Sequence, residues 1–423
     1  MFVLPFLFAT TQFEVTKLPS EVARWLVLAV AVGMAVLSGM GRGPGKGIGM
    51  VMADYMALAF LAFFAVTAVW AIDGGYSIQR TISFVLLYLA AFWYFWSYAD
   101  RFGEEQLLQL LLRTASVILG GNLLIVGVLA PGTILARRFQ GFFDNPNNIG
   151  LICALSLPLV FSDLLRKRGY WQWGEFAVLF LSLLACGSRT GLIASMAGML
   201  LIGALRAARG NRLAILFAVV LVVVIGLLSL THFFEDNVTR AESMETFSNR
   251  TGFWEMARLD YIPKRPWHGH GFGTDGMIHE YYGISLDSLQ LRGYGVMSSY
   301  YGLAVAVGIP ATILFYLALV GGLVSSLRKY WWDARLVALC AMVIAGLLVG
   351  ITESAIYSVG NCFAYLFWMG FMLMMRRSMY RRMRVPMTAQ GALRLSSAKR
   401  RDRRPRSVPR KRLEAAIPAN VSL

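Results

Sequence analysis

Charged residues are scarce in this sequence. Asp, Glu, Lys and Arg make up 15% of its 423 residues, whereas hydrophobic residues make up 57%. Soluble domains carry about 25% charged residues, and an apolar stretch of about 20 residues is long enough to cross a bilayer as a helix. Such stretches recur along the whole chain and exclude a soluble domain with a core of its own. The composition predicts an all-α membrane protein, a polytopic bundle of transmembrane helices.

Cysteine and histidine are also rare, with four of each. Because every cysteine lies within an apolar run, we expect packing residues and no disulfide. The closely spaced pair His268 and His270 has no third ligand at a recognisable zinc spacing, and no phosphate-binding glycine motif stands in its usual context. We therefore expect neither a metal nor another cofactor.

Basic residues are more abundant, since the net charge is +17. The tail 376–423 holds fifteen Lys/Arg against two Asp/Glu, and from Arg381 onward it is rich in Arg, Ser and Pro. A basic tail after a last span is typical of a cytoplasmic segment on anionic lipid, and this composition does not support a packed core. We predict a disordered cytoplasmic tail and no nucleic-acid partner.

Apolar runs of helical length divide the chain. They lie at 22–40, 49–71, 81–98, 107–130, 148–162, 175–187, 190–207, 213–231, 299–326, 335–353 and 356–375, with a short partial run at 2–10. These runs predict about eleven or twelve transmembrane helices. The predicted regions are N-terminal membrane helices (1–231), a large polar loop (232–297), C-terminal membrane helices (298–375) and the basic tail (376–423).

The Lys/Arg bias orients these spans. Basic linkers at 42–46, 166–168, 206–212 and 328–335 all fall on one side when the spans alternate, and the positive-inside rule makes that side the cytoplasm. The loop 232–297 then faces outward.

Four arginines depart from this pattern because they lie at or near the outer ends of spans: Arg80, Arg137, Arg138 and Arg189. Cations placed there suit a phosphate-bearing lipid head group. The alternative is that they snorkel to the interface or pair with local carboxylates. Arg189 favours the first interpretation, because it lies in a tight Gly-Ser-Arg-Thr-Gly turn between two apolar runs.

The large loop carries two patterns of interest. Arg250 and Trp254 lie one helical turn apart, so that a guanidinium and a flat apolar ring share a face suited to phosphate and sugar. Further on, the glycines of His-Gly-His-Gly-Phe-Gly (268–273) allow the backbone to turn sharply.

The order and spacing of these features resemble the O-antigen ligase and polymerase superfamily of bacterial envelope enzymes. The resemblance covers about residues 135–350 and rests on Gly141 to Asn147, the Ser188-Arg189 turn, Arg250 with Trp254, Pro266 to Gly273, and the helix from Ser298 to Pro310.

This resemblance implies a glycosyltransferase in the bacterial inner membrane, with its site facing the periplasm. Members move a glycan from a polyprenyl-pyrophosphate carrier to an acceptor glycan or glycolipid, without nucleotide or metal. Arg189 and Arg250 would then hold the pyrophosphate, because two fixed guanidiniums neutralise such a leaving group. Trp254 would bind substrate together with Arg250, and the weaker candidates for substrate binding are Arg137, Arg138 and Arg80. Other polysaccharide assembly proteins are possible partners.

One position departs from the family pattern. Met297 stands eleven positions before Gly308, where ligases of this family usually carry the histidine of a His-Asn pair. Methionine does not act as a base, so another residue is needed for that role. We rank His279 first because it lies nearest in sequence; the other candidates in the loop are His268, His270, Asp275 and Glu280.

Two functions of other classes stay open. One is a transporter or flippase for lipid-linked or anionic solutes, although such proteins usually show internal repeats and polar residues at mid-membrane. The other is a non-catalytic partner in a polysaccharide export complex, which the missing histidine favours. The sequence does not distinguish a ligase from a polymerase.

Overall fold

The computed structural model describes residues 14–37, 52–129, 138–143, 145–167, 169–208, 250–283, 295–358 and 363–380. Helices connected by turns and short loops make up these residues, with no strand among them, which confirms the predicted all-α class. Backbone contacts divide the chain into two units, Met1–Arg376 and Arg377–Leu423. All contacts given below belong to the first unit.

The helices follow the predicted apolar runs closely. Before the large loop they are α2 (Glu14–Leu37), α3 (Met52–Thr67), α4 (Gly74–Leu89), the π-helical turn η1 (Ala90–Phe95), α5 (Trp96–Phe102), α6 (Glu104–Leu129), α8 (Pro146–Lys167), α9 (Tyr170–Cys186) and α10 (Arg189–Ala207). In and after the loop they are α14 (Arg250–Met256), η3 (Ala257–Tyr261), η4 (Ile262–Lys264), η5 (Thr274–Gly276), α15 (Ile278–Tyr281), α16 (Ser299–Val307), α17 (Ile309–Tyr330) and α18 (Ala334–Thr352), followed by a last helix over 363–380.

Six helical stretches in the described residues are long and apolar enough to cross a membrane: Gly74–Phe102, Glu104–Val128, Pro146–Lys167, Arg189–Ala207, Ile309–Tyr330 and Ala334–Thr352. Two shorter apolar helices cover Trp25–Met34 and Asp54–Thr67. The chain is therefore a multi-pass membrane protein. The runs expected at 2–10 and 213–231 lie outside the described residues, so the total of eleven or twelve spans stays a prediction.

The single span predicted at 299–326 is wrong. Gly308 ends α16 with a φ of +85°, a conformation that favours glycine, and the chain turns back into α17. Tyr316 in α17 donates to the carbonyl of Ser299 at 2.9 Å, so the two helices run antiparallel. With nine residues, α16 is about 14 Å long, roughly half of a bilayer core.

The span predicted at 356–375 also differs at its start. Residues 353–358 are not helical, and the last helix covers 363–380. The polar Glu353 and Ser354 end the preceding helix, and the hydrogen bonds described below hold the non-helical segment in place.

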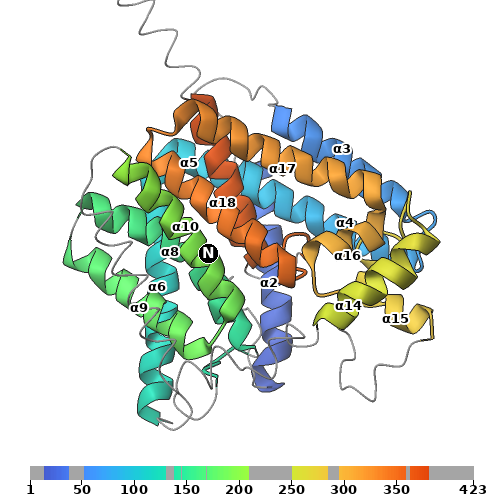
Figure 1. Ribbon diagram of the computed structural model, residues 1–423, viewed down its shortest axis with the longest axis horizontal. Coiled ribbons are helices and arrows are strands. Elements are labelled where there is room, and N and C mark those ends of the chain that lie inside the picture. Colours follow the sequence, from blue (N-terminus) through green and yellow to red (C-terminus); the bar gives the residue numbers. More distant parts are fainter. Residues whose placement is uncertain are drawn as a thin grey trace, which may run out of the picture. The chain divides into compact units, whose positions relative to one another are not determined.

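Three long helices form the centre of the bundle. Helix α8 packs against both α10 and α18, which also contact each other (Figure 1). A Cβ added to Gly198 of α10 would lie 2.7 Å from Cγ of Pro158 and 3.1 Å from the carbonyl of Ala341. Small residues at such crossings let helix backbones approach closely, as is common in membrane proteins.

Ion pairs join the helices at one end of the bundle. Glu105 at the start of α6 pairs with Arg166 at 2.5 Å and Lys167 at 3.0 Å, both at the end of α8. Arg335 at the start of α18 also binds Glu105, and it pairs with Asp163 at 3.0 Å. The basic linkers after α8 and before α18 therefore lie together, as the alternation of spans requires.

Exposed aromatic residues lie at this same end. Tyr170 and Trp171 open α9 directly after the end of α8, and Trp331 and Trp332 stand between α17 and α18. Tyrosine and tryptophan prefer the head-group level of a bilayer. This end of the bundle therefore has the residues of a membrane interface.

The first prediction concerns the side on which each end lies. We expect Glu280→Cys, at an exposed position of the large loop, to react with a membrane-impermeant thiol reagent added outside. Ser407→Cys in the tail should react only after permeabilisation. The described native cysteines are buried and give a low background. Labelling of both variants from one side would contradict the orientation.

Candidate functional site

The carboxylate of Glu353, directly after α18, connects residues from distant parts of the chain. Arg250 of α14 donates from Nη2 to Glu353 Oε1 at 2.6 Å, and Asn147 of α8 donates from Nδ2 to the same oxygen at 3.2 Å. The amide oxygen of Asn147 in turn accepts from Nη2 of Arg138 at 2.5 Å. Two of the predicted arginines, Arg138 and Arg250, therefore belong to one group of polar contacts.

The turn that carries Arg189 borders this group on two sides. On one side, Nε of Arg138 donates to the carbonyl of Cys186 at 3.0 Å. On the other, Thr190 and Thr352 share a hydrogen bond of 2.9 Å between their hydroxyls, next to Glu353. The helix that begins at Arg189 therefore starts beside Glu353 and near the contacts of Arg138.

Local chemistry explains why the chain turns at Arg189. Gly187 adopts the left-handed conformation that ends α9, and the hydroxyl of Ser188 accepts from the amide of Gly191 at 3.3 Å to cap α10. A Cβ on Gly150 would lie 2.3 Å from Cβ of Ser188. The N-termini of α8 and α10 are thus in contact, and the positive ends of two helix dipoles lie together.

The segment that follows α18 is fixed by Ser299. Its hydroxyl donates to the carbonyl of Glu353 at 2.6 Å and accepts from the amides of Ala355 and Ile356 at 3.0 and 3.1 Å. The indole of Trp368 donates to the carbonyl of Ile356 at 2.8 Å. The backbone that carries Glu353 is therefore held from both sides.

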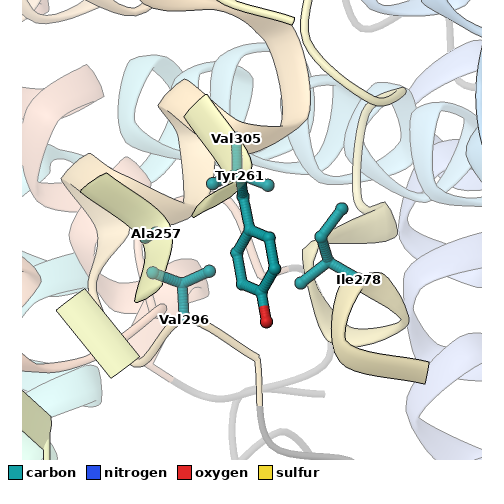
Figure 2. Packing of buried hydrophobic residues seen from close by; sticks show 5 residues of the cluster. All are labelled: Ala257, Tyr261, Ile278, Val296 and Val305. Atoms are coloured by element: carbon teal, nitrogen blue, oxygen red, sulfur yellow. The ribbon is translucent and has the colours of Figure 1, made fainter. Parts of the chain in front are cut away.

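The large loop has a hydrophobic core of its own. Ala257, Tyr261, Ile278, Val296 and Val305 are fully buried together, and Figure 2 shows them gathered around the ring of Tyr261. Since Val305 belongs to α16, this core fixes the loop to the short helix.

Trp254 lies on the same short helix as Arg250 and also reaches the start of α16. Its indole donates to the carbonyl of Met297 at 3.2 Å, and its ring stacks on Tyr301 with centroids 6.3 Å apart. Trp254 thus contacts the opening of α16, where Tyr301 partly covers its ring, and its assignment to substrate binding stays a prediction.

The glycine-rich stretch makes the sharp turns expected of it. Gly269, Gly271 and Gly273 have φ values of +69°, +108° and +78°. His270 is fully buried, with Nδ1 at 3.0 Å from the carbonyl of Val305 and Nε2 at 2.8 Å from the hydroxyl of Tyr282. Its ring is therefore part of the packing. Among the described residues, no group of three or more His, Cys, Asp or Glu side chains is arranged to hold a metal.

Arg80 lies against this glycine stretch. A Cβ on Gly273 would approach Cγ of Arg80 to 2.6 Å, and the Arg80 guanidinium stands over the ring of Tyr76 at 4.8 Å. Burial raises the pKa of the nearby Asp275, whose carboxylate accepts from the hydroxyl of Tyr357 at 2.8 Å. Arg80 thus contacts the glycine stretch, and its assignment to substrate binding stays a prediction. Arg137 lies outside the described residues.

His279 is enclosed by the loop. Its side chain is 3% exposed, Nδ1 lies 2.7 Å from the hydroxyl of Tyr261, and Phe253 packs edge-on at 5.3 Å. Burial lowers the pKa of the imidazole, which favours its neutral form. In this structure His279 packs inside the loop, and its role as a base stays a prediction.

Glu353 is the residue that sequence reasoning missed. It follows an apolar run of helical length, and a lone carboxylate in that place is usually a helix end at the membrane surface. The one available signal was its position on the predicted outer side, together with Arg189 and Arg250.

These features define a polytopic helical membrane protein with arginines gathered at one end of its bundle. Residues 176–316, from α9 into α17, match the family model described as "O-Antigen ligase". This match confirms the resemblance to the O-antigen ligase and polymerase superfamily that was seen in the sequence. No curated protein matches the chain.

The second prediction concerns the packing of His279. His279→Ala removes a buried ring and leaves the Tyr261 hydroxyl without its partner, at a cost of about 1–3 kcal/mol. We expect a melting temperature several degrees lower in detergent at pH 7.5. His268→Ala, at an exposed ring, is the control and should change it less.

Acidification should reduce this difference. Because the folded state lowers the pKa of His279, the stabilisation is present above the ordinary pKa of about 6.5 and decreases as the pH falls below it. Equal melting temperatures of wild type and His279→Ala at pH 7.5 would show that the ring does not contribute to packing.

Proposed function

We propose that this protein is a metal-independent glycosyltransferase of ligase or polymerase type. It transfers a glycan from a polyprenyl-pyrophosphate carrier to an acceptor glycan or glycolipid. The observation that carries the proposal is that Arg250 and, through Asn147, Arg138 converge on Glu353 at one end of the bundle, beside the start of the helix that Arg189 opens.

The charges of this group suit a pyrophosphate. Among the described contacts, the guanidiniums of Arg138 and Arg250 stand with the carboxylate of Glu353, and the N-termini of α8 and α10 add the positive ends of two helix dipoles. Arg250 uses one Nη2 hydrogen for Glu353, while a guanidinium has five donors in a planar fork. Glu353 therefore orients the Arg250 fork toward a phosphate without occupying all of its donors.

The chemistry follows from the leaving group. As an acceptor hydroxyl attacks the anomeric carbon, the bond between that carbon and the pyrophosphate oxygen breaks, and negative charge grows on the pyrophosphate. Fixed guanidiniums stabilise this charge most in the transition state, which is how a site of this kind accelerates transfer.

The proposal places the site at the periplasmic face of the bacterial inner membrane. Its support is that the arginine group and the basic linkers lie at opposite ends of α8 and α18, and the positive-inside rule assigns the basic end to the cytoplasm. Other polysaccharide assembly proteins are the proposed protein partners.

The glycolipid profile of a deletion strain tests the function. A ligase predicts that finished polymer stays on the lipid carrier, while a polymerase predicts that single repeat units accumulate there. An unchanged surface glycan without any lipid-linked precursor would refute both. Normal precursor synthesis with accumulation on the cytoplasmic leaflet would indicate a flippase instead.

The third prediction concerns the arginines. Arg189→Lys and Arg250→Lys keep the charge but lose the planar fork that binds two phosphate oxygens at once. A contact of this kind is worth on the order of 2–4 kcal/mol in the transition state, so we expect transfer to fall about tenfold to a thousandfold. Transfer from lipid-linked glycan in isolated membranes measures this loss.

Arg258→Lys is the matched control, because Arg258 lies in the same loop at an exposed position and outside the motif of Arg250 and Trp254. We expect near-normal transfer from this variant, with all three proteins inserted at equal levels. If both test variants work as well as Arg258→Lys, these arginines do not hold the pyrophosphate.

A further inference from the structure

We infer that Glu353 is the general base of this site, taking the proton of the acceptor hydroxyl on its Oε2 atom. This inference rests on the proposed function and deepens it, since it names the group that activates the acceptor. Four observations about the described residues carry it.

The first observation is the way the carboxylate is bound. Arg250 and Asn147 both donate to Oε1, so that one oxygen carries both hydrogen bonds. When a carboxylate serves only as an ion-pair partner, a guanidinium commonly donates hydrogen bonds to both of its oxygens. Here neither of these two partners uses Oε2, which leaves its lone pairs for a third group.

The second observation is accessibility. The side chain of Glu353 is 22% exposed, whereas that of Arg250, its partner, is 14% exposed. An acceptor hydroxyl needs to come within hydrogen-bond distance of a base, about 2.6–3.2 Å. A half-buried carboxylate allows this approach while the protein still restricts its position.

The third observation is rigidity. Ser299 holds the backbone of Glu353 and of the two residues Ala355 and Ile356 through three hydrogen bonds. Oε1 is anchored by a cation and an amide. The direction of Oε2 is therefore set by contacts on both the main chain and the side chain, as a catalytic base requires.

The fourth observation is that three polar residues of the loop, His270, His279 and Asp275, are committed elsewhere. His270 uses both ring nitrogens, His279 is enclosed at 3% exposure, and Asp275 accepts from Tyr357 at 7% exposure. Met297, at the opening of α16, carries a thioether. The backbone of Glu353 is hydrogen-bonded to Ser299, the first residue of α16. The end of α18 therefore places a carboxylate next to the start of α16, where Met297 is not a base.

The proposed step transfers one proton and one glycosyl group. The acceptor O–H bond breaks and its proton moves to Oε2 of Glu353, while the acceptor oxygen forms a bond to the anomeric carbon. The bond from that carbon to the pyrophosphate breaks, and its electron pair leaves on the pyrophosphate beside Arg189 and Arg250. Release of the proton to water restores the carboxylate.

The fourth prediction is that Glu353→Gln inactivates a correctly folded protein. The amide oxygen still accepts from Arg250 and Asn147, but the group no longer takes a proton. We expect kcat to fall about a hundredfold to ten-thousandfold, with the KM for the donor changed little. The assay uses purified protein in nanodiscs and the lipid-linked glycan that accumulates in a deletion strain. Glu255→Gln, at an exposed carboxylate on α14, is the matched control.

Anion rescue separates a base from an ion-pair partner. Glu353→Ala leaves room for a small planar anion beside Arg250. We expect formate, which is basic, to restore transfer to the same product, while nitrate, which is also a small planar anion of charge −1 but has almost no basicity, should not. Rescue by both anions would mean that Glu353 only positions Arg250, and rescue by neither would also overturn the assignment.

The outcomes also separate this inference from the proposed function. Wild-type protein that fails to transfer glycan from the extracted lipid refutes the function, and the inference with it. Active wild type with an equally active Glu353→Gln refutes the base alone and leaves the arginine site intact.

Discussion

The contact between Arg250 and Glu353 is the interaction on which the rest of the site depends. It joins the large loop to the helix bundle, and through Asn147 it reaches the start of α8. A guanidinium or carboxylate alone in a half-buried place at a membrane surface would be costly, whereas a hydrogen-bonded pair largely offsets that cost. The pair therefore makes it possible to keep Arg250 at this half-buried position.

Close packing of small residues determines where the other arginines lie. Gly150 has no side chain, so Ser188 packs directly against its backbone. The first turns of α8 and α10 therefore come into contact. Arg138 donates a hydrogen bond to the carbonyl of Cys186 at the end of α9, and Arg189 is the first residue of the following helix, α10. The large loop is positioned differently, because its buried core holds α14 and η3 against α16. Arg250 of α14 then lies within hydrogen-bond distance of Glu353.

Several features were predictable from the sequence because they depend on local chemistry. The membrane class follows from long apolar runs, and the turn at Arg189 follows from the Gly and Ser residues that end and cap helices. The single span predicted at 299–326 failed because its apolar residues concealed two local signals, Gly308 and Pro310, which end one helix and start the next. A non-local contact adds to the break, since the carbonyl of Pro266 accepts from the amide of Ile309 at 2.8 Å.

The sequence by itself determined the helical membrane fold, the resemblance to a family and the types of polar residue at the ends of the helices, since these follow from hydrophobicity and from short motifs. Only the tertiary structure decided which of those residues meet. Glu353 contacts Arg250 and Asn147 across separations of 103 and 206 residues, and no local pattern around Glu353 indicates either contact. Its importance arises from helix packing, because packing alone brings the end of α18 to the starts of α8 and α16.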